Sequence, residues 1–155
     1  MPASPYVAVV GPGEAAPEQM EVAEAVGRGL AAAGAIVVTG GRGGVMAAAC
    51  KGAERLAGTS VGILPGSDRG EANAWVSVAI PTGLGELRNG LIIRAVDAVI
   101  AVGGAYGTLS EVALALKTGV PVVGIGSWEI EGIERAATPE EAVGRALELA
   151  IGSAA

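Results

Sequence analysis

Short runs of apolar residues alternate along this chain with longer segments in which apolar residues recur at helical spacing. The run at 6–10 is Tyr-Val-Ala-Val-Val, and the Gly-Pro-Gly sequence at 11–13 ends it. A run this uniformly apolar is typical of a strand that is buried on both faces. The segment from Glu18 to Ala33 has Val22, Val26 and Leu30 on one helical face, and Gly34 supplies a helix stop. The chain therefore begins with one strand followed by one helix.

The same alternation continues to the C-terminal end. We expect further strands at 35–38, 60–64, 75–80, 98–102 and 121–125. We expect further helices at about 45–56 and 86–96, one that ends at Gly119, and one that opens at Thr138. In the last of these, Thr138 is the predicted N-cap and Glu141 completes a capping box. The segments 65–73, 81–85 and 126–137 are expected to be loops or irregular.

Strands that alternate with helices through short connections predict a particular architecture. The sequence predicts an α/β fold with a Rossmann-like, doubly wound parallel sheet and helices on both faces. The composition shows no linker, so we expect residues 1–155 to form a single nucleotide-binding domain. A sheet of this kind binds ligands outside the carboxyl ends of its strands.

Composition and charge exclude several classes of function. The chain is 51% hydrophobic, which argues against disorder, and 10 basic against 16 acidic residues give a net charge of −6. This charge disfavours nucleic acid and anionic membranes as partners, and with them a DNA-processing role. The N-terminus has no basic, apolar leader pattern, so we expect a cytoplasmic protein.

Two residue types restrict the chemistry further. The chain has no histidine, which excludes the common catalytic triads and histidine-ligated zinc. Its single cysteine, Cys50, lies in an alanine-rich run and is expected to be a small buried thiol. We expect no metal site and no resident cofactor.

Three glycine clusters follow expected strands, at 11–13, 40–44 and 103–107. Tight turns need glycine in any case, but three clusters at the same edge of a sheet favour a ligand. Glycine lets backbone amides approach an anion, and the start of a helix adds unpaired N–H groups and about half a positive charge. Phosphate-binding residues are therefore expected where the fifth strand leads into the fourth helix: Gly103, Gly104, Gly107 and Thr108.

Standard nucleotide fingerprints are incomplete in this sequence. The 11–13 cluster lacks the third glycine of the dinucleotide motif, and the 103–107 cluster lacks the lysine of a Walker loop. A mononucleotide or another phosphorylated small molecule therefore fits better than NAD or ATP. In the second cluster, Gly40, Gly41 and Arg42 are candidate binding residues, although Arg42 could equally be an exposed side chain.

Residues 103–111, Gly-Gly-Ala-Tyr-Gly-Thr-Leu-Ser-Glu, resemble the P-G-G-x-G-T-x-x-E signature of the LONELY GUY (LOG) family of phosphoribohydrolases. The loop at 40–46 is similar to that family's G-G-x-x-G-L-M loop. Arg88 and Asn89 lie where the family has an Arg-Lys pair. Because Gly103, Ala105 and Asn89 depart from the family pattern, the chain looks closer to the subfamily that includes the molybdenum cofactor carrier proteins.

The resemblance implies two alternative functions. The first is hydrolysis of the N-glycosidic bond of a nucleoside 5′-monophosphate, in which Glu111 acts on the ribose and Arg88 assists. The second is a non-catalytic carrier for molybdenum cofactor or another phosphorylated small molecule. From the residues themselves, Glu111 could instead form a capping box with Thr108. Arg88 could lie on a solvated helix face, or it could form a salt bridge with Glu86 or with a neighbouring subunit.

Two further features concern partners. Trp75 and Trp128 either stack on a ligand ring or belong to the core or an interface. The helix expected at 86–96 carries more apolar residues than one sheet face requires. Together with the resemblance, this surplus predicts a homo-oligomer, either a dimer or a tetramer.

Overall fold

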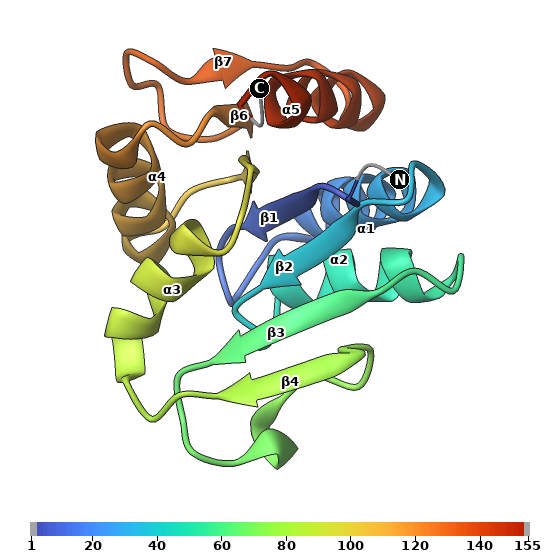
Figure 1. The fold of residues 1–155 in the computed structure, drawn as a ribbon, viewed down its shortest axis with the longest axis vertical. Coiled ribbons are helices and arrows are strands. Elements are labelled where there is room, and N and C mark those ends of the chain that lie inside the picture. The colour runs from blue at the N-terminus through green and yellow to red at the C-terminus, as the bar shows by residue number, and fades with distance from the viewer. Residues whose placement is uncertain (1–2, 154–155) are drawn as a thin grey trace.

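The computed structural model describes residues 3–153 of the chain and shows one parallel sheet between two layers of helices (Figure 1). The strand order is β4-β3-β2-β1-β5-β6-β7, and every neighbouring pair is parallel. The strands are β1 (Tyr6–Val10), β2 (Ile36–Thr39), β3 (Ser60–Leu64), β4 (Val78–Pro81), β5 (Ala98–Val102), β6 (Val122–Ile125) and β7 (Glu134–Arg135). The predicted Rossmann-like α/β fold is confirmed.

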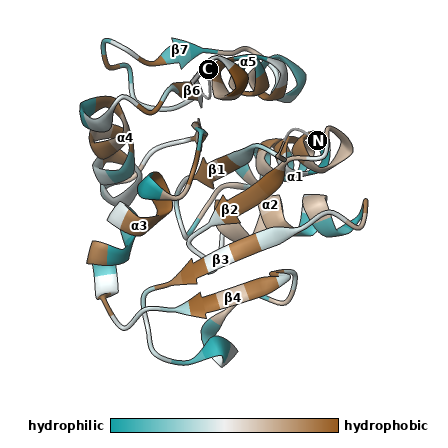
Figure 2. Cartoon of the chain, viewed as in Figure 1, coloured by the Kyte–Doolittle hydropathy of each residue, from teal (hydrophilic) through white to brown (hydrophobic). Residues whose placement is uncertain are grey.

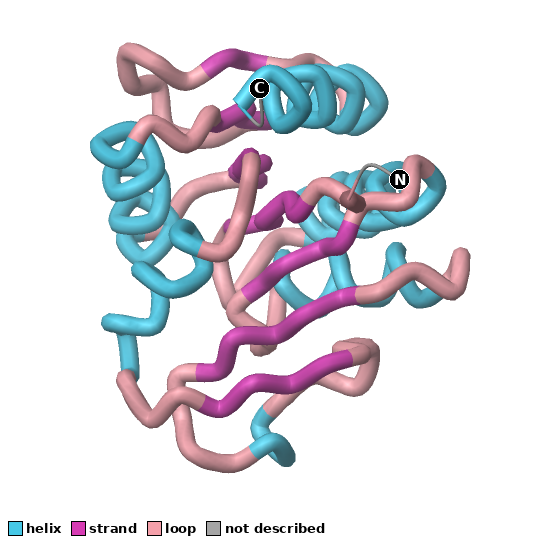
Figure 3. Tube along the Cα trace, viewed as in Figure 1, coloured by secondary structure: helices cyan, strands magenta, loops and turns pink. Residues whose placement is uncertain are grey.

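The helices divide between the two faces of the sheet, as the tube view in Figure 3 makes clear. Helices α1, α2 and α5 pack on one face, whereas α3 and α4 pack on the other. Their bounds are α1 (Pro17–Ala32), α2 (Val45–Glu54), α3 (Asn89–Arg94), α4 (Tyr106–Thr118) and α5 (Pro139–Ser153). Two short 3-10 helices, η1 (Arg69–Glu71) and η2 (Gly85–Arg88), lie in the connections. Within residues 3–153, no helix is both long enough and apolar enough to cross a membrane.

The central strands form the core because they are apolar on both faces (Figure 2). In β1, Val7 and Val9 pack toward α1 and α2, whereas Ala8 and Val10 pack toward α3 and α4. All five residues of β5 are buried. This explains why the strand sequences are continuous apolar runs and do not alternate with polar residues. Cys50 is buried in α2, as predicted.

The helix expected at 86–96 is shorter than its sequence pattern suggests. The chain forms the 3-10 helix η2 first, and the six-residue α3 follows. The Asp97 amide donates to the Tyr6 carbonyl oxygen, and the Asp97 carboxylate accepts from the Tyr6 amide. These two hydrogen bonds draw the chain into the sheet, so the helix ends before Val96.

Two strands also differ from expectation. The strand expected at 75–80 begins at Val78. Just before it, Ser60 and Ser77 exchange two amide-to-hydroxyl hydrogen bonds. The segment 126–137, expected to be irregular, contains the two-residue strand β7. A strand that short has no alternation by which the sequence could reveal it.

The predicted cap of α5 is present with a small change. The Thr138 hydroxyl accepts a hydrogen bond from the Glu141 amide at 3.1 Å, as expected of an N-cap residue. The Glu141 carboxylate accepts from the Ala137 amide at 3.1 Å, one residue before the N-cap itself. The cap therefore fixes the chain where it enters this helix.

The strand order places a switch point between β1 and β5. From β1 the chain adds β2, β3 and β4 on one side, then returns to add β5, β6 and β7 on the other. The loops that follow β1 and β5 therefore leave the sheet in opposite directions, and a crevice opens between them.

Candidate functional site

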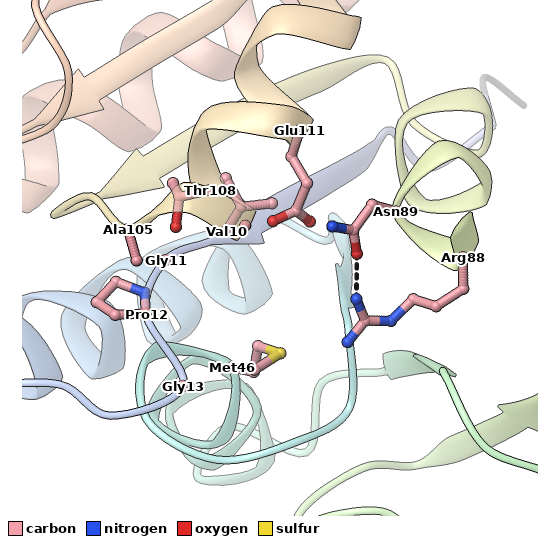
Figure 4. Close-up of a pocket in the computed structure, with 11 residues that line it drawn as sticks. Val10, Gly11, Pro12, Gly13, Met46, Arg88, Asn89, Ala105, Thr108 and Glu111 are labelled. Atoms are coloured by element: carbon pink, nitrogen blue, oxygen red, sulfur yellow. Dashed lines mark hydrogen bonds between the residues drawn. The ribbon is translucent and has the colours of Figure 1, made fainter. Parts of the chain in front are cut away.

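A cavity of about 180 Å³ lies at this switch point, outside the carboxyl ends of β1 and β5 (Figure 4). Side chains from α2, η2, α3 and α4 close it, so both layers of helices contribute. The lining residues are Val10, Gly11, Pro12, Gly13, Met46, Arg88, Asn89, Ala105, Gly107, Thr108 and Glu111.

The first turn of α4 forms one wall of the cavity. Ala105 is the N-cap, so Gly107 and Thr108 belong to the helix, and the first-turn amides have no partner within the helix. The Thr108 side chain is only 2% exposed, and its hydroxyl has no hydrogen-bond partner among the described residues. A buried hydroxyl without a partner costs about 1–3 kcal/mol. A polar ligand in the cavity would remove this cost.

Glu111 follows Thr108 by one turn and points from α4 into the cavity (Figure 4). Its side chain is 8% exposed. Burial raises the pKa of Glu111 to about 8, and the positive charge of Arg88 offsets part of that rise. At neutral pH the carboxyl group is therefore mostly protonated, and it presents an O–H donor to the cavity.

Arg88 approaches from the opposite side of the cavity, at the end of η2. Its Nε donates to the Ile63 carbonyl at 2.9 Å, and its Nη2 donates to the Gly40 carbonyl at 3.4 Å. Burial lowers the pKa of Arg88, and the negative charge of Glu111 opposes this effect. Two backbone carbonyls from the far half of the sheet thus hold the guanidinium group in place.

Gly40 is required beside Arg88 for a steric reason. A Cβ atom at residue 40 would lie 2.6 Å from the Arg88 Nη2 and 2.8 Å from the Met46 sulfur. The glycine after β2 therefore makes room for the guanidinium group and does not itself line the cavity. Its role is to let Arg88 reach the site.

Asn89 connects the two sides of the cavity. Its Oδ1 accepts from the Arg88 Nη1, and its Nδ2 donates to the Ser110 hydroxyl at 3.1 Å. The Ser110 hydroxyl in turn donates to the Gly107 carbonyl at 2.7 Å. This chain of hydrogen bonds runs from the guanidinium group to the first turn of α4, so the two polar walls are positioned as one unit.

The structure brings four of the expected site residues together in the cavity: Arg88, Gly107, Thr108 and Glu111. Gly103 has a φ of +66° and lies against Gln19, where a Cβ would be 2.4 Å from the amide nitrogen of that side chain. Gly104 lies against Trp128. Both glycines therefore shape the loop from outside the cavity.

The second glycine cluster lies further away. Gly41 packs against Leu64, and neither Gly41 nor Arg42 lines the cavity. Arg42 forms an exposed ion pair with Glu71 at 3.1 Å, and its carbonyl accepts from the Asn73 side chain. Arg42 is thus at the surface, held against the loop that contains η1.

The geometry argues against two of the alternative roles considered for Glu111 and Arg88. The N-cap of α4 is Ala105, so Thr108 and Glu111 lie inside the helix and do not form its capping box. Arg88 binds backbone carbonyls and is half-buried, so it does not lie on a solvated helix face. Both side chains are directed to the cavity.

The residues that sequence reasoning did not select for the site are mainly small or apolar. Pro12 and Gly13 were visible as part of a glycine cluster after the first strand, but without a side chain that suggested chemistry. Met46 and Asn89 reach the site only because α2 and α3 meet the same sheet edge. The sequence did place the 11–13 cluster at the edge of the sheet where a ligand was expected, but it assigned no binding role to a residue in that loop.

The donor set of this cavity suits a singly or doubly charged oxyanion. It offers helix amides, an unpartnered hydroxyl, a protonated carboxyl group and a guanidinium group. Within residues 3–153, no group of three or more metal-ligating side chains is present.

The size of the cavity limits what it can hold, because drug-sized ligands occupy pockets of about 300–1,000 Å³. A cavity of about 180 Å³ therefore has room for one group of a larger ligand.

Comparison with known proteins places the chain in a family. The family model described as SLOG cluster4 matches residues 4–149. The chain belongs to the SLOG cluster4 family. An uncharacterized protein of Archaeoglobus fulgidus is 42% identical over 138 residues, which are 88% of this chain and 91% of that protein.

Solved structures similar to this SLOG cluster4 chain include two proteins linked to molybdenum cofactor. The molybdenum cofactor binding protein of Rippkaea orientalis is 36% identical with a TM-score of 0.90, and the match covers 95% of this chain and 98% of that one. The molybdenum cofactor carrier protein of Chlamydomonas reinhardtii is 35% identical with a TM-score of 0.86, over 95% and 98% of the two chains. The expected similarity to carrier proteins is confirmed, whereas the matched family is named SLOG cluster4 and not LONELY GUY.

Proposed function

We propose that this SLOG cluster4 protein binds a phosphorylated small molecule without transforming it, and that its cargo is molybdenum cofactor or a related phosphorylated pterin. The observation that carries this proposal is the buried, unpartnered Thr108 hydroxyl at the start of α4. An oxyanion at this point accepts from the hydroxyl and from the first-turn amides. The similar carrier and binding proteins support the choice of cargo.

The protonation of Glu111 supports binding over catalysis. Cleavage of an N-glycosidic bond develops positive charge on the ribose, and an ionised carboxylate stabilises that charge. With a pKa of about 8, Glu111 is mostly neutral at pH 7 and supplies little of this stabilisation. A neutral carboxyl group is instead compatible with an adjacent phosphate, to which it donates a hydrogen bond.

Phosphoribohydrolase activity on a nucleoside 5′-monophosphate is the second candidate. It is favoured by the position of Glu111 and Arg88 on one cavity, where a carboxyl group and a cation both face the ligand. In that case the bound substrate would have to lower the pKa of Glu111 enough to ionise it.

One experiment separates the two candidates. Calorimetry measures binding of purified molybdenum cofactor, and chromatography measures free base and ribose 5-phosphate after incubation with a panel of nucleoside monophosphates. Cofactor binding without base release supports the carrier. Base release that Glu111→Gln abolishes supports the hydrolase instead.

A matched pair of variants tests the phosphate site itself. Thr108→Val removes the unpartnered hydroxyl with little change of shape, and we expect weaker cofactor binding. Thr118→Val makes the same change at the other end of α4, where the hydroxyl bonds to the Leu114 and Ala115 carbonyls. If both variants bind the cofactor as wild type does, the phosphate does not lie at Thr108.

We also propose that the protein is a homo-oligomer. Leu84 at the N-cap of η2, Leu87 in η2 and Leu91 in α3 are all exposed, Leu87 by 78%. The edge strand β4 adds Val78 and Ile80, which are also exposed. A second copy that covers this apolar surface explains why it is apolar. Light scattering on wild type and Leu87→Glu tests this, and a monomeric wild type at micromolar concentration contradicts it.

A further inference from the structure

Two of the few aromatic side chains of this protein lie together beside the cavity. The chain has two Trp, two Tyr and no Phe. Tyr106 is the first residue of α4 and follows β5, whereas Trp128 follows β6, the next strand in the sheet. Both residues line a surface pocket of about 350 Å³, whose other lining residues are Gly104 and Ala105. We call this pocket, lined by residues 104–106 and 128, the aromatic rim.

The aromatic rim adjoins the cavity of the candidate site at one residue. Ala105 lines both pockets, so a ligand long enough to pass this residue could reach from one to the other. The cavity holds only one group of a larger ligand, because its volume is about 180 Å³. The remaining part of such a ligand needs an adjacent surface, and the rim provides one with almost twice the volume.

The local structure holds the Trp128 ring in place. Its Nε1 donates to the Ala105 carbonyl at 3.3 Å. A Cβ atom at Gly104 would lie 2.9 Å from that nitrogen, so the glycine allows the indole to lie against the loop. Tyr106 is 85% exposed, and a large aromatic side chain at that exposure has little contact with its own core. The indole of Trp128, held by its hydrogen bond, and the exposed phenol of Tyr106 therefore lie together at the surface.

The chemistry of the rim specifies what it binds. None of its four lining residues is charged, and its polar groups are backbone atoms, one phenol hydroxyl and one indole N–H. Aromatic faces of this kind stack on flat heterocyclic rings. An aliphatic chain or a second phosphate would gain less binding free energy from these rings, because neither has a flat face with which to stack.

We infer that Tyr106 and Trp128 bind the planar heteroaromatic ring of the ligand whose phosphate lies at Thr108. This inference rests on the proposed phosphate site and adds to it the ring class, which purines and pterins share. The ligand then extends from the first turn of α4 across Ala105 to the carboxyl end of β6. Its ring specificity resides in two side chains outside the cavity.

Binding of ligands with and without a heteroaromatic ring tests this directly. GMP carries a purine whose amino and keto groups match those of a pterin, and ribose 5-phosphate carries the same sugar phosphate without a heteroaromatic ring. For Tyr106→Ala and Trp128→Leu we expect GMP to bind at least about fivefold more weakly, since stacking on an aromatic side chain contributes about 1–3 kcal/mol. Ribose 5-phosphate should change by less than about twofold. Trp75→Leu is the matched control, because Trp75 is also partly exposed but lies beside Lys51.

A fluorescence measurement separates failure of this inference from failure of the phosphate site. In Trp75→Phe, Trp128 is the sole indole, and we expect guanosine, which has no phosphate, to quench its emission. If ribose 5-phosphate binds wild type but the rim variants lose no GMP affinity and guanosine quenches nothing, the rim does not hold a ring. If guanosine quenches Trp128 but ribose 5-phosphate does not bind, the phosphate site is wrong and the rim stands. Trp128 emission that responds only to protein dilution would assign this surface to a second copy and overturn the inference.

Discussion

Replacement of Glu111 by glutamine should stabilise the folded protein, and the gain should grow with pH. The unfolded chain releases the Glu111 proton near pH 4.5, whereas the folded protein retains it until about pH 8. Between these values the folded state binds a proton that the unfolded state has lost, so rising pH favours unfolding. Glutamine fills the same space and does not titrate, so the variant does not carry this penalty.

The size of the effect follows from the pKa of about 8. Each pH unit between the unfolded and folded pKa values corresponds to about 1.4 kcal/mol. The advantage of Glu111→Gln in free energy of unfolding is therefore near zero at pH 4.5, about 3 kcal/mol at pH 7 and about 5 kcal/mol above pH 8. For a chain of this length, about 3 kcal/mol raises the melting temperature by about 10 °C.

Urea unfolding of both proteins at pH 5, 6, 7 and 8 measures the difference. Glu134→Gln is the control with the opposite sign, because the hydrogen bond from Arg145 lowers the pKa of this exposed carboxylate. Its ion pair stabilises the folded state above pH 4.5, and this stabilisation is lost as the pH falls through the lowered pKa. A Glu111→Gln advantage that is the same at pH 5 and pH 8 would refute the reasoning, since it would mean that Glu111 titrates alike in both states.

Three further predictions concern the same cavity. Thr108→Val should raise the free energy of unfolding by about 1 kcal/mol in denaturant titrations, because it removes a buried, unpartnered hydroxyl, whereas Thr118→Val should lower it. Gly107→Ala should fold as well as wild type, since nothing lies within 4 Å of the added Cβ, but calorimetry should show that it binds a phosphorylated ligand more weakly. The control is Gly144→Ala in α5, where the added Cβ also has nothing within 4 Å and ligand binding should be normal. Affinity for ribose 5-phosphate should fall between pH 7 and pH 9, because Glu111 ionises beside the anion, and a flat profile would contradict its place in the site.

The sequence predicted the architecture well because the two patterns that reveal it, apolar runs and glycines after helices, are local. Continuous apolar runs such as 98–102 identify strands buried on both faces, and a glycine after α1, α2 and α4 marks where the chain turns back. The errors occurred where a tertiary contact overrides the local pattern. Asp97 hydrogen-bonds to Tyr6, which is 91 residues away, and this pairing shortens a helix whose apolar spacing continues to Val96.

The candidate site was predictable only in part. The residues of the 103–111 motif lie on one turn and helix, so their proximity is local, and the sequence revealed it. The position of Arg88 depends on the Ile63 and Gly40 carbonyls, which belong to other strands. The elevated pKa of Glu111 depends on burial between α4 and the rest of the cavity, and no sequence pattern reports it.

The short turn η2 has a second consequence, which concerns the two proposals made for this protein. Arg88 faces inward from this turn, and Leu87, its neighbour in the chain, faces outward. The second copy that we propose to cover Leu87 would therefore contact the same short turn that positions the guanidinium group. The proposed subunit contact and the proposed ligand site would then share η2, one on each of its sides.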